Sequence, residues 1–214
     1  MKPIGVFGGT FDPIHFGHIR PMLEIRESTG ISQVHYIPNS RPGHRDQPQT
    51  ASIHRWNMMV LALDSRPDFV ADDRELRRAG MSYMVTTLRS LRSEFALRPL
   101  CLILGMDAFL HIHRWYWWAD VLKLANIIVM NRPGADFPNQ LPGWWLQALE
   151  FNPWILHRKM SGCILHVAVE RVNISATELR SRIARGDDCS ESLPESVYEY
   201  INKHNLYQST GGTP

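Results

Sequence analysis

Short apolar runs alternate with longer amphipathic stretches along most of this 214-residue chain. The apolar runs have the length and the β-branched content of buried strands. They predict strands at residues 3–7, 33–38, 69–72, 100–104, 126–130 and 164–169. The amphipathic stretches repeat apolar residues at helical spacing. They predict helices at residues 17–28, 52–64, 83–94, 117–125, 142–149, 175–184 and 194–204.

Alternating strands and helices are typical of crossover units, in which a helix connects two parallel strands. We therefore predict an α/β fold: a Rossmann-like, doubly wound, mainly parallel sheet with helices on both faces. Such sheets bind ligands beyond the carboxyl ends of the strands, near the point where the strand order reverses. The glycine turn after the first strand, the loop after Ile37 and the turn at residues 105–107 all follow strands. We expect them to converge on one crevice.

One domain accounts for the length, because 214 residues that are 44% hydrophobic and 21% charged can bury a full core. We expect this domain to span residues 1–208 and a mobile tail to follow at 209–214. A formal net charge of +2 without any basic run argues against a nucleic-acid partner. No apolar run approaches the roughly 18 residues of a membrane span, so no membrane partner is expected.

The cysteines Cys101, Cys163 and Cys189 are an odd and scattered set, which fits reduced thiols better than a disulfide framework. The first predicted strand lies close to the N-terminus, so we expect no signal peptide. These features predict a cytoplasmic protein. The sequence leaves the oligomeric state open, with a homodimer as one alternative. It also leaves open whether Trp144 and Trp145 cover the core or form a partner surface.

The most informative segment is residues 4–18, where an apolar run meets a glycine turn and two histidines. Gly8 and Gly9 allow the backbone to approach a ligand, and a helix that begins beside them favours anions through its free N–H groups and its dipole. His15 and His18 lie three residues apart, so both imidazoles can face one phosphate. The alternatives are a tight turn with surface histidines and a metal site, for which a third ligand at recognisable spacing is missing.

A second motif, ISATELR at residues 174–180, opens a helix near the other end of the chain. Ser175 suits the N-cap position and Glu178 would complete a capping box, which is an adequate structural explanation for both. That explanation does not cover Arg180. Its guanidinium suits the phosphates that gather near a helix N-terminus.

The segment GGTFDPIHFGH resembles the GxFDPxHxGH signature of the nucleotidyltransferase superfamily, and ISATELR resembles its ISxTxxR element. These enzymes transfer a nucleotidyl group from a nucleoside triphosphate to a phosphate or a similar acceptor. The resemblance implies that His15, His18 and Arg180 are catalytic and that Mg²⁺ arrives mainly bound to ATP. It implies ATP contacts at Gly8, Gly9, Thr10, Phe11, Gly105, Asp107, Arg132, Ser175 and Thr177.

The middle of the chain resembles the bacterial nicotinate-nucleotide adenylyltransferases. PNSRPGHR is similar to their PNxxPPHK element, with Gly43 for the second proline and Arg45 for the lysine. LGMDAF, HRWYWW and NRPG are similar to their LGxDxF, HxWxxW and xRPG elements. The resemblance implies that the pyridine ring stacks on Trp115. The mononucleotide contacts that it implies are Asn39, His44, Arg45, Tyr83, Met84 and Trp115. A helix cap at Asp107 and a surface position for Arg132 are the structural alternatives.

The family commonly carries SYTxDT, where this chain reads SYMVTT, with Met84 for threonine and Thr86 for aspartate. This departure bears on the choice between an acid and an amide substrate. The resemblance predicts an enzyme that joins nicotinate mononucleotide and ATP to give deamido-NAD and pyrophosphate in NAD biosynthesis. The alternatives are the amide mononucleotide or phosphopantetheine as acceptor, and a catalytically silent paralogue that binds a nucleotide.

Overall fold

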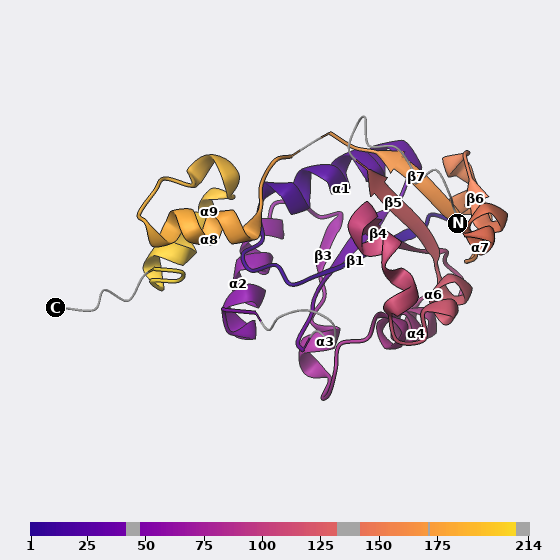
Figure 1. Cartoon of the computed structure of the whole chain (residues 1–214), viewed down its shortest axis with the longest axis horizontal. Coiled ribbons are helices and arrows are strands. Elements are labelled where there is room, and N and C mark those ends of the chain that lie inside the picture. The colour runs from indigo at the N-terminus through magenta and orange to yellow at the C-terminus, as the bar shows by residue number, and fades with distance from the viewer. Residues whose placement is uncertain (42–47, 132–141, 171, 209–214) are drawn as a thin grey trace.

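A computed structural model of the chain describes residues 1–41, 48–131, 142–170 and 172–208. Across these ranges the strands form one seven-stranded sheet in the order β3-β2-β1-β4-β5-β7-β6, with every neighbouring pair parallel (Figure 1). The strands are β1 (Ile4–Gly9), β2 (Gln33–Pro38), β3 (Phe69–Ala71), β4 (Leu100–Gly105), β5 (Asn126–Asn131), β6 (Leu149–Glu150) and β7 (Ile164–Ala168). The predicted fold class is confirmed.

The helices alternate with the strands as the periodicity predicts. They are α1 (Phe16–Thr29), α2 (Ser52–Leu63), α3 (Arg74–Arg77), α4 (Met84–Glu94), α5 (Met106–Leu110), α6 (Trp118–Leu124), α7 (Gly143–Ala148), α8 (Ala176–Ala184) and α9 (Glu195–Lys203). Short 3-10 turns lie at Ile112–Arg114, Pro153–His157 and Ser190–Ser192. The sequence patterns did not predict α3, α5 or β6.

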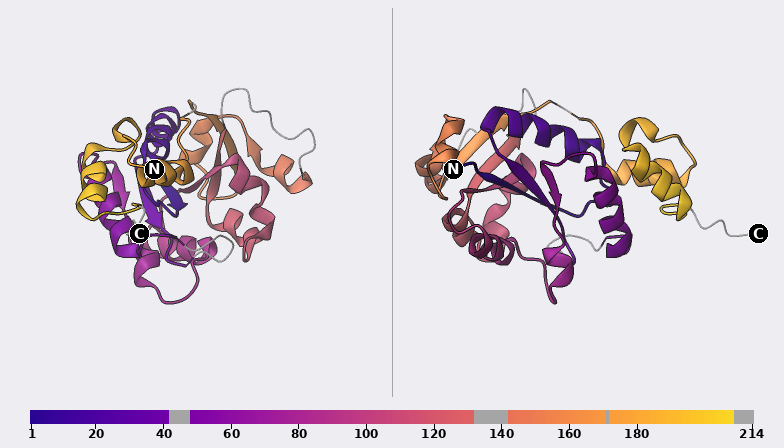
Figure 2. Two further views of the ribbon diagram at one scale, coloured as in Figure 1. Left: turned by 60° about the vertical axis from the view of Figure 1, so that its left-hand side comes forward. Right: turned by 180° about the vertical axis from the view of Figure 1, so that it is seen from behind.

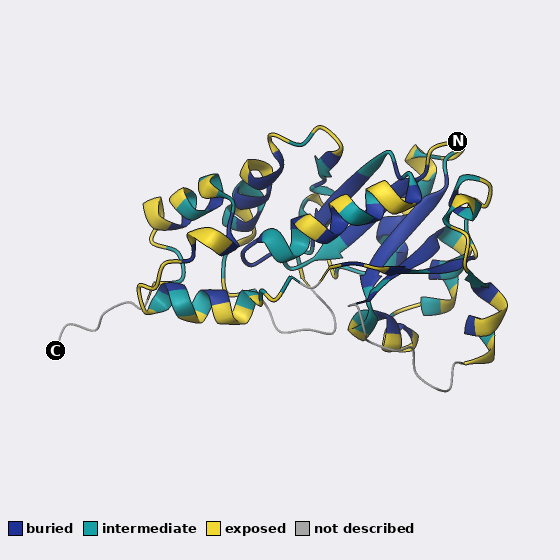
Figure 3. Ribbon diagram, turned by 90° about the horizontal axis from the view of Figure 1, so that it is seen from above, coloured by how far each residue is buried: buried dark blue, intermediate teal, exposed yellow. Residues whose placement is uncertain are grey.

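Strand alternation sends neighbouring residues into two different cores. Phe7 packs with α1, α2, α8 and α9 on one face of the sheet, whereas Val6 packs with α4, α5, α6 and α7 on the other. Strand β5 repeats the pattern, with Ile128 on the first face and Val129 on the second. The central strands are therefore buried, and they lie between helices whose outer faces are exposed (Figure 3, dark blue and yellow). A sheet covered on both faces needs nearly continuous apolar strands, which is what the sequence provides.

The order of the strands reverses beside β1. The chain builds β1, β2 and β3 outward in one direction and then returns, so that β4 pairs with the other edge of β1. The switch point therefore lies between β1 and β4, which end at Gly9 and Gly105. A crevice is expected beyond these two residues.

Helices α8 and α9 lie at one end of the molecule, next to α2 (Figures 1 and 2). Ser196 Oγ donates to the carbonyl of Leu61 at 3.2 Å, and Asn57 Nδ2 donates to the Tyr200 hydroxyl at 2.9 Å. Leu179 and Ile201 join the same buried cluster as the α1 face of the sheet. The motif at residues 174–180 therefore lies close to α1.

The structure settles the position of Trp144 and Trp145. Trp145 is 3% exposed and belongs to the buried core, where its ring centroid lies 4.2 Å from that of Phe109, and the half-buried Trp144 packs against the same core. Cys101, Cys163 and Cys189 are free and buried. None of the helices in the described ranges is long and apolar enough to cross a bilayer. The tail at 209–214 lies outside the described residues.

Candidate active site

Two adjoining pockets open at the switch point. The histidine pocket is lined by the turn after β1, by His18 of α1, by the start of α5 and by the first residues of α8. The aromatic pocket lies beside it, and Tyr83, Trp115 and Tyr116 are among its lining residues. The two pockets share a wall made of Gly8, Gly9, Leu104 and Ala108. Loops from β1, β2 and β4 thus converge as the strand positions predict.

The predicted residues divide between the two pockets. The histidine pocket is lined by Gly8, Gly9, Thr10, Phe11, His18, Gly105, Asp107, Thr177 and Arg180. The aromatic pocket is lined by Gly8, Gly9, Asn39, Tyr83, Met84 and Trp115. His15 and Ser175 line neither pocket. His44, Arg45 and Arg132 lie outside the described residues.

His15 and His18 meet at the start of α1. The backbone N–H of His15, the N-cap residue, donates to Nδ1 of His18 at 3.3 Å, and the two ring centroids lie 3.8 Å apart. His15 is 4% exposed and lies behind His18, which lines the pocket. Because Nδ1 of His18 accepts a hydrogen bond, the neutral ring carries its proton on Nε2. His18 can therefore donate to a ligand in the pocket.

Burial keeps both imidazoles neutral at pH 7. Desolvation lowers the pKa of His15 from 6.5 to about 4. The pKa of His18 is lowered well below 6.5, first by desolvation and then by the proximity of His15. Each ring thus offers one N–H donor rather than a full positive charge.

The N-termini of α1 and α8 border the same pocket. A Cβ atom on Gly17 would lie 3.5 Å from Cβ of Ile174 and 2.9 Å from the His15 ring, so glycine permits this close approach. Ser175 occupies the N-cap position of α8, but its side chain makes no capping hydrogen bond, so the expected capping box with Glu178 is wrong. The hydroxyl of Ser175 stays on an exposed residue at the edge of the site.

Arg180 links the two sequence motifs. Its Nη1 donates to the carbonyl of Asp12 at 2.8 Å, and its Nη2 donates to Oγ1 of Thr177 at 3.3 Å. Its Nε is buried and has no hydrogen-bond partner among the described residues. Three donors of one guanidinium thus lie where the turn after β1 and the start of α8 meet, a suitable place to bind an anion.

Asp12 anchors the turn after β1, a role that the sequence analysis missed. Its carboxylate accepts hydrogen bonds from the Tyr207 hydroxyl at 2.6 Å and from the backbone N–H groups of Gln49 and Thr50 at 2.9 and 3.3 Å. Burial raises the pKa of Tyr207, and the nearby Asp12 charge raises it further, so the phenol remains a donor. No local pattern connects residues this far apart, although Asp12 belongs to the N-terminal motif.

Asp107 is not a helix cap. Gly105 is the N-cap of α5, and Asp107 lies in the first turn of that helix, exposed at the histidine pocket. The structural alternative weighed for this residue is therefore wrong. Its carboxylate is available to a ligand hydroxyl.

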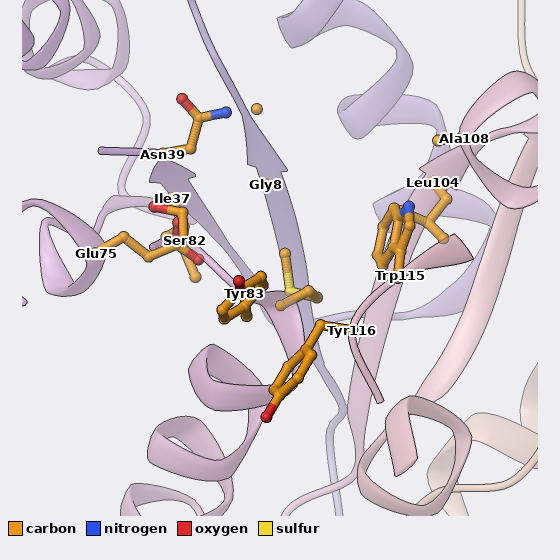
Figure 4. Close-up of a pocket in the computed structure, with 12 residues that line it drawn as sticks. Gly8, Ile37, Asn39, Glu75, Ser82, Tyr83, Leu104, Ala108, Trp115 and Tyr116 are labelled. Carbon is orange, nitrogen blue, oxygen red and sulfur yellow. The ribbon is translucent and has the colours of Figure 1, made fainter. Parts of the chain in front are cut away.

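The aromatic pocket has one apolar side and one polar side. Figure 4 shows Trp115 and Leu104 across from Asn39, Ser82 and Glu75, with Tyr83 and Tyr116 below them. The Tyr83 and Tyr116 ring centroids lie 4.5 Å apart. Glu75 is 4% exposed and accepts a hydrogen bond from the Thr87 hydroxyl. A flat ring with polar substituents fits this shape. Ser82, Glu75 and Tyr116 were not among the predicted contacts.

Met84 packs against the wall between the pockets. A Cβ atom on Gly8 would lie 2.7 Å from Cε of Met84, so the side chain contacts the backbone of β1. Met84 lines the aromatic pocket and not the histidine pocket. The departure from the family pattern in the SYMVTT segment therefore lies at the aromatic pocket.

Taken together, the geometry places an anion site beside a site for a flat ring. The described residues contain no group of three or more His, Cys, Asp and Glu side chains that could hold a metal ion. The histidine pocket combines two helix N-termini, a neutral imidazole donor and Arg180. Such an arrangement can bind a polyphosphate. A phosphate bound in the aromatic pocket would lie next to it, on the other side of the shared wall.

Comparisons with known proteins agree with this geometry. The cytidylyltransferase-like family model matches residues 6–182. The chain is 41% identical to the probable nicotinate-nucleotide adenylyltransferase of Pectobacterium atrosepticum, over 94% of this chain and 97% of that protein. It is 39% identical to the protein of the same name from Aeromonas salmonicida, over 97% of this chain and 98% of that protein.

Solved structures share the fold. Plasmodium falciparum nicotinic acid mononucleotide adenylyltransferase complexed with NaAD superimposes with a TM-score of 0.72 at 18% identity, covering 97% of this chain and 98% of that one. A putative nicotinate-nucleotide adenylyltransferase from Vibrio parahaemolyticus superimposes with a TM-score of 0.65 at 14% identity, covering 98% of each chain. At these identities the likeness concerns the fold.

Proposed function

The chain belongs to the cytidylyltransferase-like family and, within it, to the nicotinate-nucleotide adenylyltransferases, and on that premise we propose that it joins nicotinate mononucleotide and ATP to give deamido-NAD and pyrophosphate. This nucleotidyl transfer is a step of NAD biosynthesis. The observation that carries the proposal is that the two pockets are adjacent and share a wall, in which Gly8 and Gly9 expose their backbone to both. Two nucleotides bound on either side of that wall have their phosphates next to each other.

ATP occupies the histidine pocket. The N-termini of α1 and α8 face its phosphates, His18 donates through Nε2 to the α-phosphate, and Arg180 neutralises the leaving pyrophosphate. His15 acts through the His18 ring, which it contacts from behind. The remaining ATP contacts are Gly8, Gly9, Thr10, Phe11, Gly105, Asp107 and Thr177, joined by Ser175 and Arg132 on the strength of the sequence motifs.

Nicotinate mononucleotide occupies the aromatic pocket. Its electron-poor ring stacks on Trp115, and Tyr83, Met84 and Asn39 complete the contacts. The motif at residues 38–45 supports a further contact of the mononucleotide phosphate with His44 and Arg45. Arginine keeps the charge of the family lysine, but its forked geometry differs.

The reaction needs no protein nucleophile. The mononucleotide phosphate is already an anion and attacks the α-phosphorus of ATP, forming the new P–O bond as the bond to pyrophosphate breaks in line. Catalysis then consists of positioning the two phosphates and stabilising the charge that develops on their oxygens. His18 and Arg180 are the groups that supply this stabilisation.

A Mg²⁺ ion bound to the phosphates of ATP would neutralise part of their charge in the histidine pocket. The Asp12 carboxylate is engaged by Tyr207, Gln49 and Thr50, which supports delivery on the phosphates rather than a site built by that residue. Three buried free cysteines support a cytoplasmic location. A buried cluster that runs from Phe7 to Ile201 supports a single domain over residues 1–208.

Pyrophosphate release tests the function directly. Purified protein is given Mg-ATP with nicotinate mononucleotide, its amide or phosphopantetheine at equal concentration. We expect release with the acid at least tenfold above that with the amide and none above background with phosphopantetheine. Release that is higher with the amide would mean that the protein prefers the amide mononucleotide, and we would attribute that preference to the SYMVTT segment. No release with any acceptor would overturn the proposal in favour of a silent nucleotide-binding paralogue.

A further inference from the structure

Arg55, on the first turn of α2, is the largest fully buried side chain of the described residues, 1% exposed. Within the described residues, its guanidinium donates only to backbone carbonyls. Nη1 donates to Thr10 at 2.7 Å, Nη2 to Asn39 at 2.9 Å, and Nε to Thr50 at 3.2 Å. Three separate segments of the chain therefore turn a carbonyl toward one cation.

The three segments are those that form the site. Thr10 lines the histidine pocket on the turn after β1, and Asn39 lines the aromatic pocket on the loop after β2. Asn39 is also bonded directly to the turn after β1: its backbone N–H donates to the carbonyl of Gly9 at 2.9 Å, and its Nδ2 donates to Thr10 Oγ1 at 3.3 Å. The planar guanidinium of Arg55 thus connects the loop that lines the histidine pocket with the loop that lines the aromatic pocket.

The charge of Arg55 has no ion-pair partner within 4.0 Å in the described parts of the chain. Burial lowers the pKa of Arg55, and the charge of Asp12 opposes that effect. Burying a cation is costly, and here three hydrogen bonds to backbone carbonyls offset that cost. The planar fork of arginine serves the three carbonyls at once, a geometry that a lysine ammonium does not reproduce.

We propose that Arg55 is a positioning residue, which sets the distance and angle between the two reacting phosphates by holding the Thr10 and Asn39 carbonyls. The inference rests on the proposed function, because it assigns one nucleotide to each pocket. In-line transfer depends on alignment, and a displacement of about 1 Å can cost about a hundredfold in rate. Arg55 touches no reacting atom and acts through the two loops.

Arg92 on α4 provides a matched control. It also donates to backbone carbonyls, at 2.7 Å to Arg98, 2.7 Å to Leu124 and 2.9 Å to Met160. These carbonyls lie before β4, β5 and β7, at the amino ends of the strands, whereas Thr10 and Asn39 follow the carboxyl ends of β1 and β2. The two arginines therefore share their bonding and differ in their distance from the site.

The experiment compares Arg55→Lys with Arg92→Lys in the full chain. We measure thermal unfolding, ATP affinity, and kcat and KM for both substrates by pyrophosphate release. We expect both variants to unfold at lower temperature. We expect kcat of Arg55→Lys to fall about a hundredfold, with both KM values within threefold of wild type, because lysine cannot reproduce the fork. Arg92→Lys should keep kcat within twofold.

A second variant protects the test against poor folding. In Arg55→Ala, added methylguanidinium should raise kcat at least tenfold without raising kcat of Arg92→Ala, since the small cation can refill the cavity. Equal losses of kcat in the two lysine variants, a loss confined to KM for one substrate, or no rescue in folded Arg55→Ala would overturn the inference. An inactive wild type would instead overturn the proposed function, so the two failures are distinguishable.

Discussion

The hydroxyl of Tyr207 donates a 2.6 Å hydrogen bond to Oδ1 of Asp12, across 195 residues of sequence. Asp12 lies in the turn that forms one side of the histidine pocket, and its carbonyl accepts from Arg180. The segment after α9 therefore helps to fix the turn on which the N-terminal motif lies. Tyr207 does not line either pocket, so it affects substrates through Asp12.

Replacing Tyr207 by Phe should weaken both stability and catalysis. The loss of a hydrogen bond to a buried carboxylate should lower the free energy of unfolding by about 2 kcal/mol. The freed turn should lower kcat by about tenfold, with little change in KM. Urea unfolding and steady-state kinetics measure the two effects. Tyr200→Phe is the control, since Tyr200 on α9 bonds His54 and Asn57 away from the pockets. A normal kcat in folded Tyr207→Phe would contradict the prediction.

His18→Ala should slow adenylyl transfer about a hundredfold while the fold remains intact. The variant removes a donor that acts on the α-phosphate, and such donors contribute about 3 kcal/mol, or about a hundredfold in rate. Single-turnover pyrophosphate release measures the loss, and circular dichroism checks the fold. His111→Ala, at an exposed position after α5, should retain normal activity. Unchanged turnover in His18→Ala would refute the proposed mechanism.

The stability of the ligand-free protein should fall as the pH drops from 6.5 toward 4. The pKa of His15 is about 4 in the folded state, against 6.5 for an unburied imidazole, so the unfolded state binds the extra proton in this window. His15 alone should make the protein about 2 kcal/mol less stable at pH 5 than at pH 7, and His18 acts in the same direction.

Urea unfolding at the two pH values tests this sign. His15→Gln should flatten the dependence, since glutamine does not titrate. Asp72 does not interfere: burial would raise its pKa, but hydrogen bonds from His35 and Arg74 outweigh burial and lower it to about 2. Its stabilising contribution is therefore lost only below about pH 3.8. A wild-type stability that is flat between pH 7 and pH 5 would contradict the neutral burial of the pair.

Met84→Thr should act on one substrate. Met84 lines the aromatic pocket and packs on Gly8 there, so its replacement changes the space available to the mononucleotide. We expect KM for nicotinate mononucleotide to change between threefold and tenfold and KM for ATP to stay within twofold. Steady-state kinetics with each substrate varied in turn provides the measurement. A change confined to KM for ATP would contradict the assignment of the pockets.

Most of the fold follows from local patterns in the sequence, because a buried parallel sheet needs apolar strands between amphipathic helices. Strand β2 has the predicted bounds, and β1 extends two residues past its predicted end into the glycine turn. The missed elements are short. Strand β6 has two residues, and α3 has four residues, three of which are charged. Neither is long enough to show a hydrophobic period. Gly105 favoured a turn where the first residues of α5 form a helix.

The residues of the candidate site also divide into those that the sequence predicts and those that only the structure shows. Residues that contact a ligand through a loop motif, such as Thr10 and Trp115, are visible in the sequence because the motif is contiguous. Arg55 and Tyr207 are not, since their partners are a set of backbone carbonyls and a carboxylate from distant segments. Helical spacing places Arg55 on the same face of α2 as the buried Met58 and Met59, but a charged residue type does not by itself predict burial. The three carbonyls that surround its guanidinium come from segments that only the fold brings together.

The wall that the two pockets share has a consequence for inhibitor design. Gly8 and Gly9 add no side chain of their own to the wall, and the ends of the Met84 and Phe11 side chains lie against them, so one molecule that extends across both pockets needs to move only these two ends. Two weak fragments joined over this wall would lose their translational freedom once instead of twice, and their affinities would combine through effective concentration. The half in the aromatic pocket would lie beside Met84, and the half in the histidine pocket would lie beside His18 and Arg180.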